Sequence, residues 1–377
     1  MNIGEAIKDM RKLLGLTQMQ LAKEMHVAFS TVNRWENNRI IPNGMARALL
    51  SDFMSKNGID EKLIRVIKKF ESSPVPIHID RGLAPLVYDK KERGNMIRIV
   101  TDTGSDITYL GASALGMESL ELSITFSEFP YDVRNDTDFS IFYENLVKAK
   151  NLPTTSQVTP AQYLDVFNDA KEKGHDVLVI TLSGGLSGTY QSALMAKEEC
   201  DYDRIVVIDS RQAIMPQRAL AEHAVKLRDE GKNLAEIEQV ILDLKERLVV
   251  FGMLDTLTYL KKGGRVPPAM ALIGNVLNIK PVIILRGGVL EPLGKVRGSQ
   301  AGKQTLWKQL EKDGYDESWP IYFGHINCEA RCKEFMQETI DKFGLKKESC
   351  IMYPIGGIIG THLGPGSLLL SCVKKAV

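Results

Sequence analysis

The sequence contains no long hydrophobic run and only a few cysteines. No apolar segment approaches the ~20 residues needed to cross a bilayer, and the polar, amphipathic N-terminus is unlike a signal peptide. The five cysteines are odd in number and lack the spacing of a disulfide framework. We therefore expect a soluble, cytoplasmic protein with free thiols and no membrane insertion.

Motifs of several functional classes are missing as well. Neither Gly-x-Gly-x-x-Gly nor a Walker lysine follows a predicted strand, which argues against a nucleotide-binding site. Cys328 and Cys332 lie four residues apart near His325, but no second pair of ligands follows at zinc-site spacing. The two cysteines fit small core residues better. We expect neither a metal nor a cofactor.

The composition is that of a globular α/β protein. With 377 residues, 44% apolar and 25% charged, the chain should form two or three units. Strand-like segments alternate with helical stretches in its central part, which predicts βαβ units and a mostly parallel sheet. These segments lie near Ile97, Leu120, Val177, Ile205 and Val249. Apolar runs at 281–285 and 290–296, joined by Gly287 and Gly288, predict a hairpin that begins a second lobe.

Three loops combine glycine or proline with hydroxyls or a histidine; they lie at residues 151–157, 182–191 and 360–366. The second loop leads from an apolar strand into an amphipathic helix. A helix N-terminus has unpaired N–H groups and favours an anion, and Ser183, Ser187 and Thr189 can add hydroxyl donors. Each loop alone fits ordinary caps and turns. Two such loops in one α/β unit favour an anion-binding site.

These loops, and the part of the chain from about residue 97 to the C-terminus, resemble the DegV family of bacterial fatty-acid-binding proteins. Several further motifs occur in the right order, which makes the resemblance far more specific than a single glycine motif. They lie at residues 99–103, 260–265, 274–281 and 295–298. In one place the chain departs from the family pattern, since the usual paired serines are here Ser183 and Gly184. We expect a more flexible loop there.

The resemblance implies a two-lobed α/β carrier that buries one long-chain fatty acid such as palmitate. Thr155 and Ser187 would hold the carboxylate, with His362 close by and Arg265 near the mouth of the acyl site. Ser156 and Gly188 belong to the same implied site. In family members that work with a fatty acid kinase, the carrier presents the lipid to a separate ATP-dependent subunit. Such a partner is left open here, and the chain itself is expected not to be an enzyme.

The alternative is an acyl hydrolase that uses Ser187 as its nucleophile. His362 and Asp102 could complete a Ser, His and Asp set. However, residues 185–188 read Gly-Leu-Ser-Gly and lack the Gly-x-Ser-x-Gly pattern of a nucleophile elbow. The loop is better suited to donate hydrogen bonds.

The first seventy residues differ from the rest of the chain. Apolar residues recur at helical spacing in 3–14, 19–25 and 30–35, and Thr17 with Gln20 predicts a capping box. Residues 16–38 resemble the Cro/C1-type (XRE) helix-turn-helix. The resemblance implies that Gln18 contacts the DNA phosphate backbone and that residues 29–36 enter the major groove. Within this segment Val32 and Trp35 should pack inward, whereas the groove-facing residues should be Ser30, Thr31, Asn33 and Arg34.

These observations predict a chain of three parts: a helix-turn-helix domain at 1–70, a proline-containing linker at 71–96 and a DegV-type domain at 97–377. The lobes of the last part should meet near residue 255, with 97–255 in one lobe and 256–377 in the other. Residues 1–73 carry twelve Lys and Arg against eight Asp and Glu, which mildly favours DNA binding. We expect a fatty-acid-responsive transcription regulator that binds DNA as a homodimer. Alternatively, the N-terminal module mediates only protein contacts.

Overall fold

The computed structural model describes residues 3–25, 32, 35–36, 42, 44–68, 96–129, 139–267, 270 and 278–375. The chain divides into two compact units, Met1–Lys91 and Glu92–Val377. Within the described residues, no helix combines the length and the apolar character that a membrane span requires.

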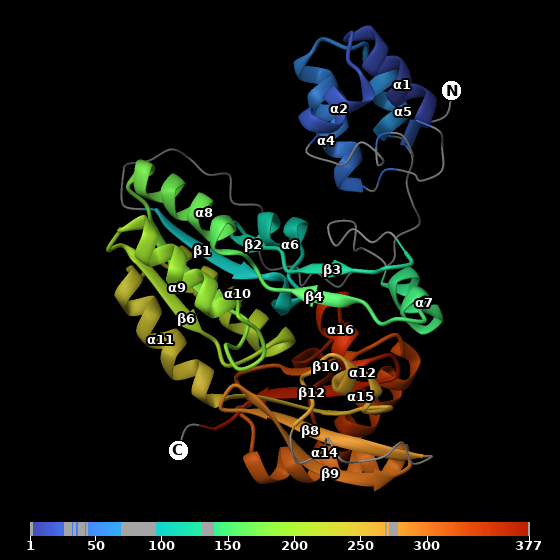
Figure 1. The fold of residues 1–377 in the computed structure, drawn as a ribbon, viewed down its shortest axis with the longest axis vertical. Coiled ribbons are helices and arrows are strands. Elements are labelled where there is room, and N and C mark those ends of the chain that lie inside the picture. Colours follow the sequence, from blue (N-terminus) through green and yellow to red (C-terminus); the bar gives the residue numbers. More distant parts are fainter. Residues whose placement is uncertain are drawn as a thin grey trace. The chain divides into compact units, whose positions relative to one another are not determined.

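The first unit is helical (Figure 1). It contains α1 (Ile3–Leu13), α2 (Gln18–Glu24), α4 (Gly44–Lys56) and α5 (Glu61–Lys68). The predicted capping box before α2 is confirmed, because the Thr17 N–H donates to Gln20 Oε1 (2.8 Å) and the Gln20 N–H donates to Thr17 Oγ1 (3.2 Å). Val32 and Trp35 are buried, as predicted. They pack in one core with apolar residues of these helices, among them Ile7, Met10, Leu21, Leu50 and Met54.

A buried carboxylate, that of Glu36, connects two helices of this unit through hydrogen bonds. Glu36 accepts hydrogen bonds from Arg11 Nε (2.5 Å) and from Gln18 Nε2 (2.7 Å), and its side chain is only 1% exposed. Burial alone would raise the pKa of Glu36, but the hydrogen bonds from Arg11 and Gln18 lower this pKa below its usual value. The Gln18 amide therefore stabilises the fold of the helical unit through its hydrogen bond to Glu36.

The second unit begins with a four-stranded parallel sheet, which with its helices we call the first lobe. The strand order is β2 (Glu118–Leu120), β1 (Ile97–Asp102), β5 (Asp176–Thr181) and β6 (Ile205–Asp209). Helices α8 (Pro160–Lys173) and α9 (Thr189–Cys200) pack side by side, and so do α10 (Ile214–Asp229) and α11 (Leu234–Arg247). The short helices η1 (Thr103–Ser105) and α6 (Tyr109–Ala114) follow β1. The parallel βαβ arrangement is confirmed for this lobe.

The second lobe contains a six-stranded sheet in which only β10 and β11 are parallel. The strand order is β11 (Cys350–Pro354), β10 (Ile321–His325), β12 (Leu368–Val373), β7 (Leu248–Met253), β8 (Ile279–Arg286) and β9 (Val289–Arg297). Helices α14 (Ser299–Asp313) and α15 (Glu329–Phe343) pack against this sheet, and the short η3 (Lys347–Ser349) precedes β11. The predicted β8–β9 hairpin is confirmed, and both turn glycines have positive φ, 58° for Gly287 and 87° for Gly288.

The predicted position of one strand, β7, is wrong. The segment near Val249 was expected to extend the parallel series, but β7 lies between β12 and β8 in the second sheet and is antiparallel to both. All of its residues are buried, so an apolar run of this kind does not reveal which sheet it joins. The second sheet therefore begins at Leu248, before the expected lobe boundary near residue 255.

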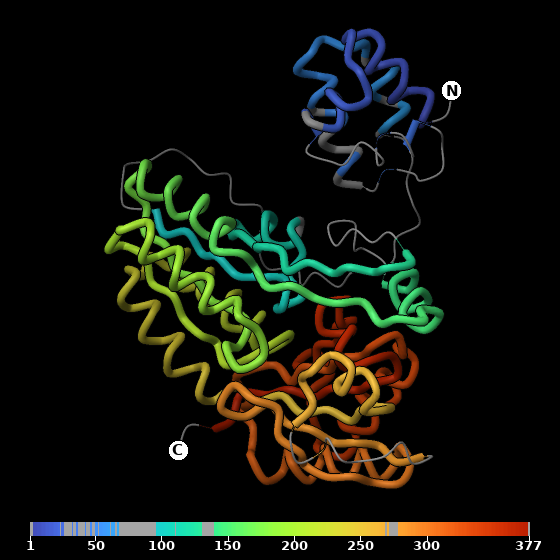
Figure 2. The backbone as a smooth tube through the Cα atoms, in the orientation of Figure 1, coloured from blue at the N-terminus to red at the C-terminus, as the bar shows by residue number. Residues whose placement is uncertain are grey.

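A two-stranded ribbon and a helix connect the lobes. Strands β3 (Ser123–Thr125) and β4 (Thr154–Ser156) run away from the parallel sheet toward α7 (Ser140–Lys148), and α16 (Gly357–Leu363) contacts all three (Figures 1 and 2). Tyr143 of α7 donates its hydroxyl to the Ile355 carbonyl (2.5 Å) just before α16. A Cβ at Gly360 would lie 2.1 Å from the Tyr143 hydroxyl, so α16 needs glycine there. α16 also packs on α12 (Thr258–Lys262).

Candidate functional site

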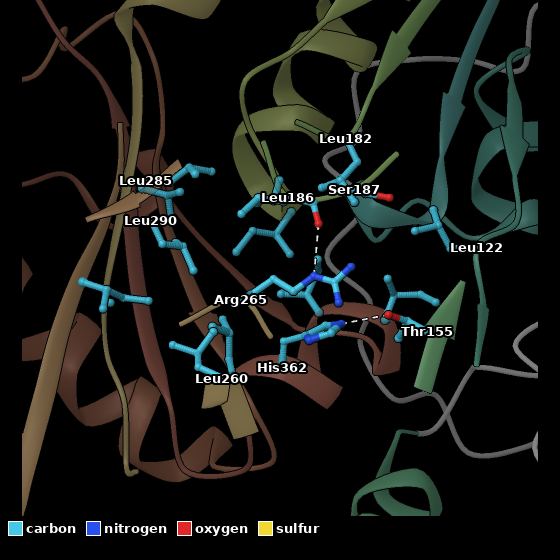
Figure 3. Close-up of a pocket in the computed structure, with 18 of the residues that line it drawn as sticks. Leu122, Thr155, Leu182, Leu186, Ser187, Leu260, Arg265, Leu285, Leu290 and His362 are labelled. Carbon is cyan, nitrogen blue, oxygen red and sulfur yellow. Dashed lines mark hydrogen bonds between the residues drawn. The ribbon is translucent and has the colours of Figure 1, made fainter. Parts of the chain in front are cut away.

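A cavity of about 300 Å³ lies between the first lobe and the second sheet (Figure 3). Most of its wall is aliphatic and comes from both lobes. These residues are Leu122, Leu182, Leu186, Ala213, Ile214, Val250, Leu260, Ile283, Leu285, Leu290, Ile358, Ile359, Leu363 and Leu369. A cavity of this size and lining is suited to a largely apolar ligand.

Polar groups lie at one end of the cavity, across from Leu285 and Leu290 (Figure 3). Thr155 Oγ1 and His362 Nε2 are 2.8 Å apart. Arg265 donates from Nη1 to the Gly263 carbonyl (2.7 Å) and from Nε to the Leu186 carbonyl (3.2 Å). The wall is thus apolar at one end and offers hydroxyl, imidazole and guanidinium groups at the other.

Local structure fixes the positions of these polar side chains. Thr155 is the middle residue of β4, where the alternation of the strand turns it to the opposite side from Thr154 and Ser156. The structure thus corrects the expectation that 154–156 is a loop. Ser187 and Gly188 precede α9, and Ser187 Oγ lies 2.9 Å from Thr189 Oγ1. A Cβ at Gly188 would lie 2.0 Å from Gln157 Oε1, so a larger residue at 188 would have to displace the Gln157 side chain.

His362 is neutral at physiological pH. Burial, and to a lesser extent the nearby positive charge of Arg265, lower the pKa of its imidazole to about 4. Its Nδ1 is buried without a hydrogen-bond partner. A Cβ at Gly263 would lie 2.3 Å from this Nδ1, so glycine at 263 makes room for the ring.

The structure brings together six residues that the sequence singled out. Thr155, Ser156, Ser187, Gly188, Arg265 and His362 all line the cavity. Ser183 has another role: its hydroxyl donates to the Gly288 carbonyl (2.7 Å) at the β8–β9 turn and accepts from the Gly185 N–H (3.2 Å). The expectation that Ser183 adds a free donor for an anion is wrong, because the second lobe occupies that hydroxyl.

The Ser, His and Asp set of the alternative hydrolase is not assembled. Ser187 is hydrogen-bonded to Thr189 and His362 to Thr155. Asp102 is fully buried at the end of β1, where it accepts from the N–H groups of Leu182 (2.7 Å) and Gly104 (2.9 Å). These bonds and one from Gln217 Nε2 (3.1 Å) show that Asp102 positions the start of the 182–188 loop. Burial raises the pKa of Asp102 to about 6.

The two cysteines weighed as zinc ligands donate to backbone carbonyls instead. The Cys332 thiol points to the Gly324 carbonyl (3.7 Å) and the Cys328 thiol to the Ser367 carbonyl (3.4 Å). Burial raises the pKa of Cys332 to about 12. Among the described residues, no cluster of three His, Cys, Asp or Glu side chains could hold a metal ion.

Of the residues expected to contact DNA, only Gln18 lies within the described part, where it bonds to Glu36. Ser30, Thr31, Asn33 and Arg34 lie outside the described residues, as does most of the expected linker.

Comparison with known proteins identifies both parts of the chain. Residues 96–375 match the family described as uncharacterised proteins of the DegV family. The chain belongs to the DegV family. DegV domain-containing protein YteA of Lactococcus lactis is 32% identical over 287 residues, which cover 74% of this chain and 98% of the relative. Residues 7–51 match the helix-turn-helix family to which Cro/C1-type domains belong.

Solved DegV structures share this fold. A DegV family protein from Thermus thermophilus, described by its fatty acid binding, aligns with a TM-score of 0.66 at 29% identity and covers 74% of this chain and 100% of its own. A DegV family protein from Eubacterium eligens, loaded with heptadecanoic acid, aligns with a TM-score of 0.63 at 27% identity over 74% of this chain and 100% of its own. The Fatty Acid Kinase B3 protein of Streptococcus pneumoniae, loaded with linoleic acid, aligns with a TM-score of 0.65 at 25% identity and covers 74% of this chain and 100% of its own.

Proposed function

We propose that the DegV part of this chain, residues 97–377, binds one long-chain fatty acid. The observation that carries the proposal is the cavity, which is aliphatic along most of its wall and polar at one end. The fatty acids in the related structures from Thermus thermophilus and Eubacterium eligens support the same ligand class.

In this proposal Thr155 and Ser187 donate hydrogen bonds to the carboxylate. A neutral His362 that donates its Nε2–H to Thr155 Oγ1 leaves the threonine hydroxyl proton free for the ligand. Arg265 supplies the positive charge at this end of the cavity, where a carboxylate loses much of its hydration. Ser156 and Gly188 also line the cavity. The acyl chain then lies along the aliphatic residues, whose burial of methylene groups supplies most of the affinity.

The protein acts as a carrier or sensor and not as an enzyme. A hydrolase would need a general base within hydrogen-bonding distance of Ser187, but the hydroxyl partner of Ser187 is Thr189, while His362 pairs with Thr155. The Streptococcus pneumoniae relative, a fatty acid kinase protein, favours a role in which the bound lipid is presented to a kinase subunit.

The N-terminal domain, residues 1–70, adds sequence-specific DNA binding to this function. The match to the helix-turn-helix family and the helical core with buried Val32 and Trp35 support it. A small domain of this kind makes few phosphate contacts, so the chain binds a two-fold operator as a dimer. Lipid controls DNA affinity if it binds the DNA-competent arrangement more tightly than the other.

Mass spectrometry of the protein as purified tests the central proposal. We expect a co-purified long-chain fatty acid in wild type and its loss in the Thr155→Ala, Ser187→Ala double variant; retention of the lipid by the double variant would contradict the assigned site. Incubation with an activated acyl ester tests the alternative that the protein is a hydrolase. Turnover of the ester by wild type, and its loss in Ser187→Ala, would establish that alternative. Operator titration at one fixed salt concentration, with stripped and loaded protein, tests lipid control, and equal affinities would contradict it.

A further inference from the structure

The floor of the cavity contains a row of alternating small and large residues. Within the second sheet, Gly252 of β7 lies opposite Leu369 of β12, which in turn lies opposite Gly324 of β10. Gly252 and Leu369 both line the cavity. Because residues opposite one another in a sheet point to the same face, Leu369 stands between two positions that have no side chain.

Leu369 already fills the space above both glycines. A Cβ at Gly252 would lie 2.9 Å from Leu369 Cδ2 and 3.1 Å from the Leu368 carbonyl oxygen. On the other side, a Cβ at Gly324 would meet Met215 Sδ (2.8 Å), Ile355 Cδ1 (3.0 Å) and Leu369 Cβ (3.2 Å). The Gly324 side is therefore occupied, so a side chain at residue 252 would push Leu369 into the cavity.

Gly252 lies between the polar end of the cavity and its far end. Strand β7 leads into α12, which carries Leu260 beside His362, whereas Val250 pairs with Leu285 and Leu285 with Leu290. Leu285 and Leu290 are across the pocket from Thr155 (Figure 3). Two residues of an antiparallel strand span about 6.8 Å, so Gly252 is one such step closer to the polar end than Val250.

We propose that Gly252, with Leu369 beside it, determines how long an acyl chain the cavity accepts. This inference rests on the proposed fatty acid binding and adds its chain-length selectivity. Without a side chain at residue 252, the acyl tail passes over β7 and reaches the pocket formed by Val250, Leu285 and Leu290. A larger residue at 252 closes that passage and leaves the carboxylate end unchanged.

Titration of lipid-stripped protein with saturated fatty acids of increasing length tests this proposal. For Gly252→Ala we expect unchanged affinity for the shorter acids and a progressive loss for longer ones, about fourfold for each methylene that no longer fits. Leu369→Ala should shift the preference toward longer or bulkier chains, and the double variant should restore a profile near that of wild type. Gly294→Ala is the matched control, because a Cβ there meets no atom within 4 Å and Gly294 does not line the cavity.

The outcomes separate this inference from the proposed function. If wild-type protein binds none of the acids, the proposed function itself is wrong. If wild type binds them and the folded Gly252→Ala protein keeps the same length profile, Gly252 does not determine length. Should Gly252→Ala fail to fold, the Leu369→Ala profile decides: an unchanged preference overturns the proposal, and a shift to longer chains supports it.

Discussion

Replacing Thr155 with valine is the sharpest test of the binding geometry. The change keeps a β-branched side chain in β4 and removes the hydroxyl that lies 2.8 Å from His362 Nε2. Hydrogen bonds to charged groups contribute about 1.5–3 kcal/mol, so loss of the bond to the carboxylate should weaken fatty acid binding roughly 10- to 150-fold. The substitution also leaves His362 without this partner, which should lower the free energy of unfolding by about 1–3 kcal/mol.

Thr154→Val is the matched control for this variant. Thr154 neighbours Thr155 in the same strand but is exposed and does not line the cavity. Competition titration with a fluorescent fatty acid measures affinity, and scanning calorimetry of ligand-free protein measures stability. If Thr155→Val binds the acid as tightly as Thr154→Val while both remain folded, Thr155 does not hold the carboxylate.

The pH dependence of stability provides a related test for His362. The folded-state pKa of about 4 lies below the ordinary histidine value, so between these two pKa values the unfolded chain binds a proton that the folded protein does not. This imidazole should therefore cost no stability above about pH 6.5 and should destabilise the fold progressively as pH falls toward 4. His362→Asn should remove that part of the acid sensitivity. An identical pH profile of unfolding in the variant and in wild type would contradict the assignment.

Three further predictions concern Asp102, Glu36 and Gly263. The folded-state pKa of Asp102, about 6, lies above the value of about 4 expected in the unfolded chain, so the contribution of this carboxyl to stability should fall as pH rises from about 4 to 6. Calorimetry of Asp102→Asn should show no such fall. The variant should also lose about 1–3 kcal/mol of stability, because the asparagine amide would be mispaired with the N–H donors around it. Glu36→Gln should destabilise the helical unit by about 3 kcal/mol, because Arg11 loses its buried ionic partner. Faster amide hydrogen exchange in α1 of the variant would reveal this loss of stability. Gly263→Ala should displace His362, since the added Cβ would lie 2.3 Å from its Nδ1; unchanged fatty acid affinity would refute the steric role of this glycine.

Local features of the fold could be predicted from the sequence because each depends on residues close together in the chain. The capping box at Thr17 and Gln20 and the β8–β9 hairpin both follow from short-range hydrogen bonds or backbone preferences. The family motifs likewise identified Thr155, Ser187 and His362, and the structure brings all three to one cavity.

The tertiary structure decided the contacts between distant segments. Thr155 and His362 are 207 positions apart, and only the packing of the β3–β4 ribbon on α16 brings them to 2.8 Å. The assignment of β7 to the second sheet depends on its partners β12 and β8, which a uniformly apolar strand does not specify. Ser183 was expected to face a ligand, but the second lobe supplies the Gly288 carbonyl that binds its hydroxyl. Short-range patterns determine which elements form, whereas the close packing of the two lobes determines which side chains meet.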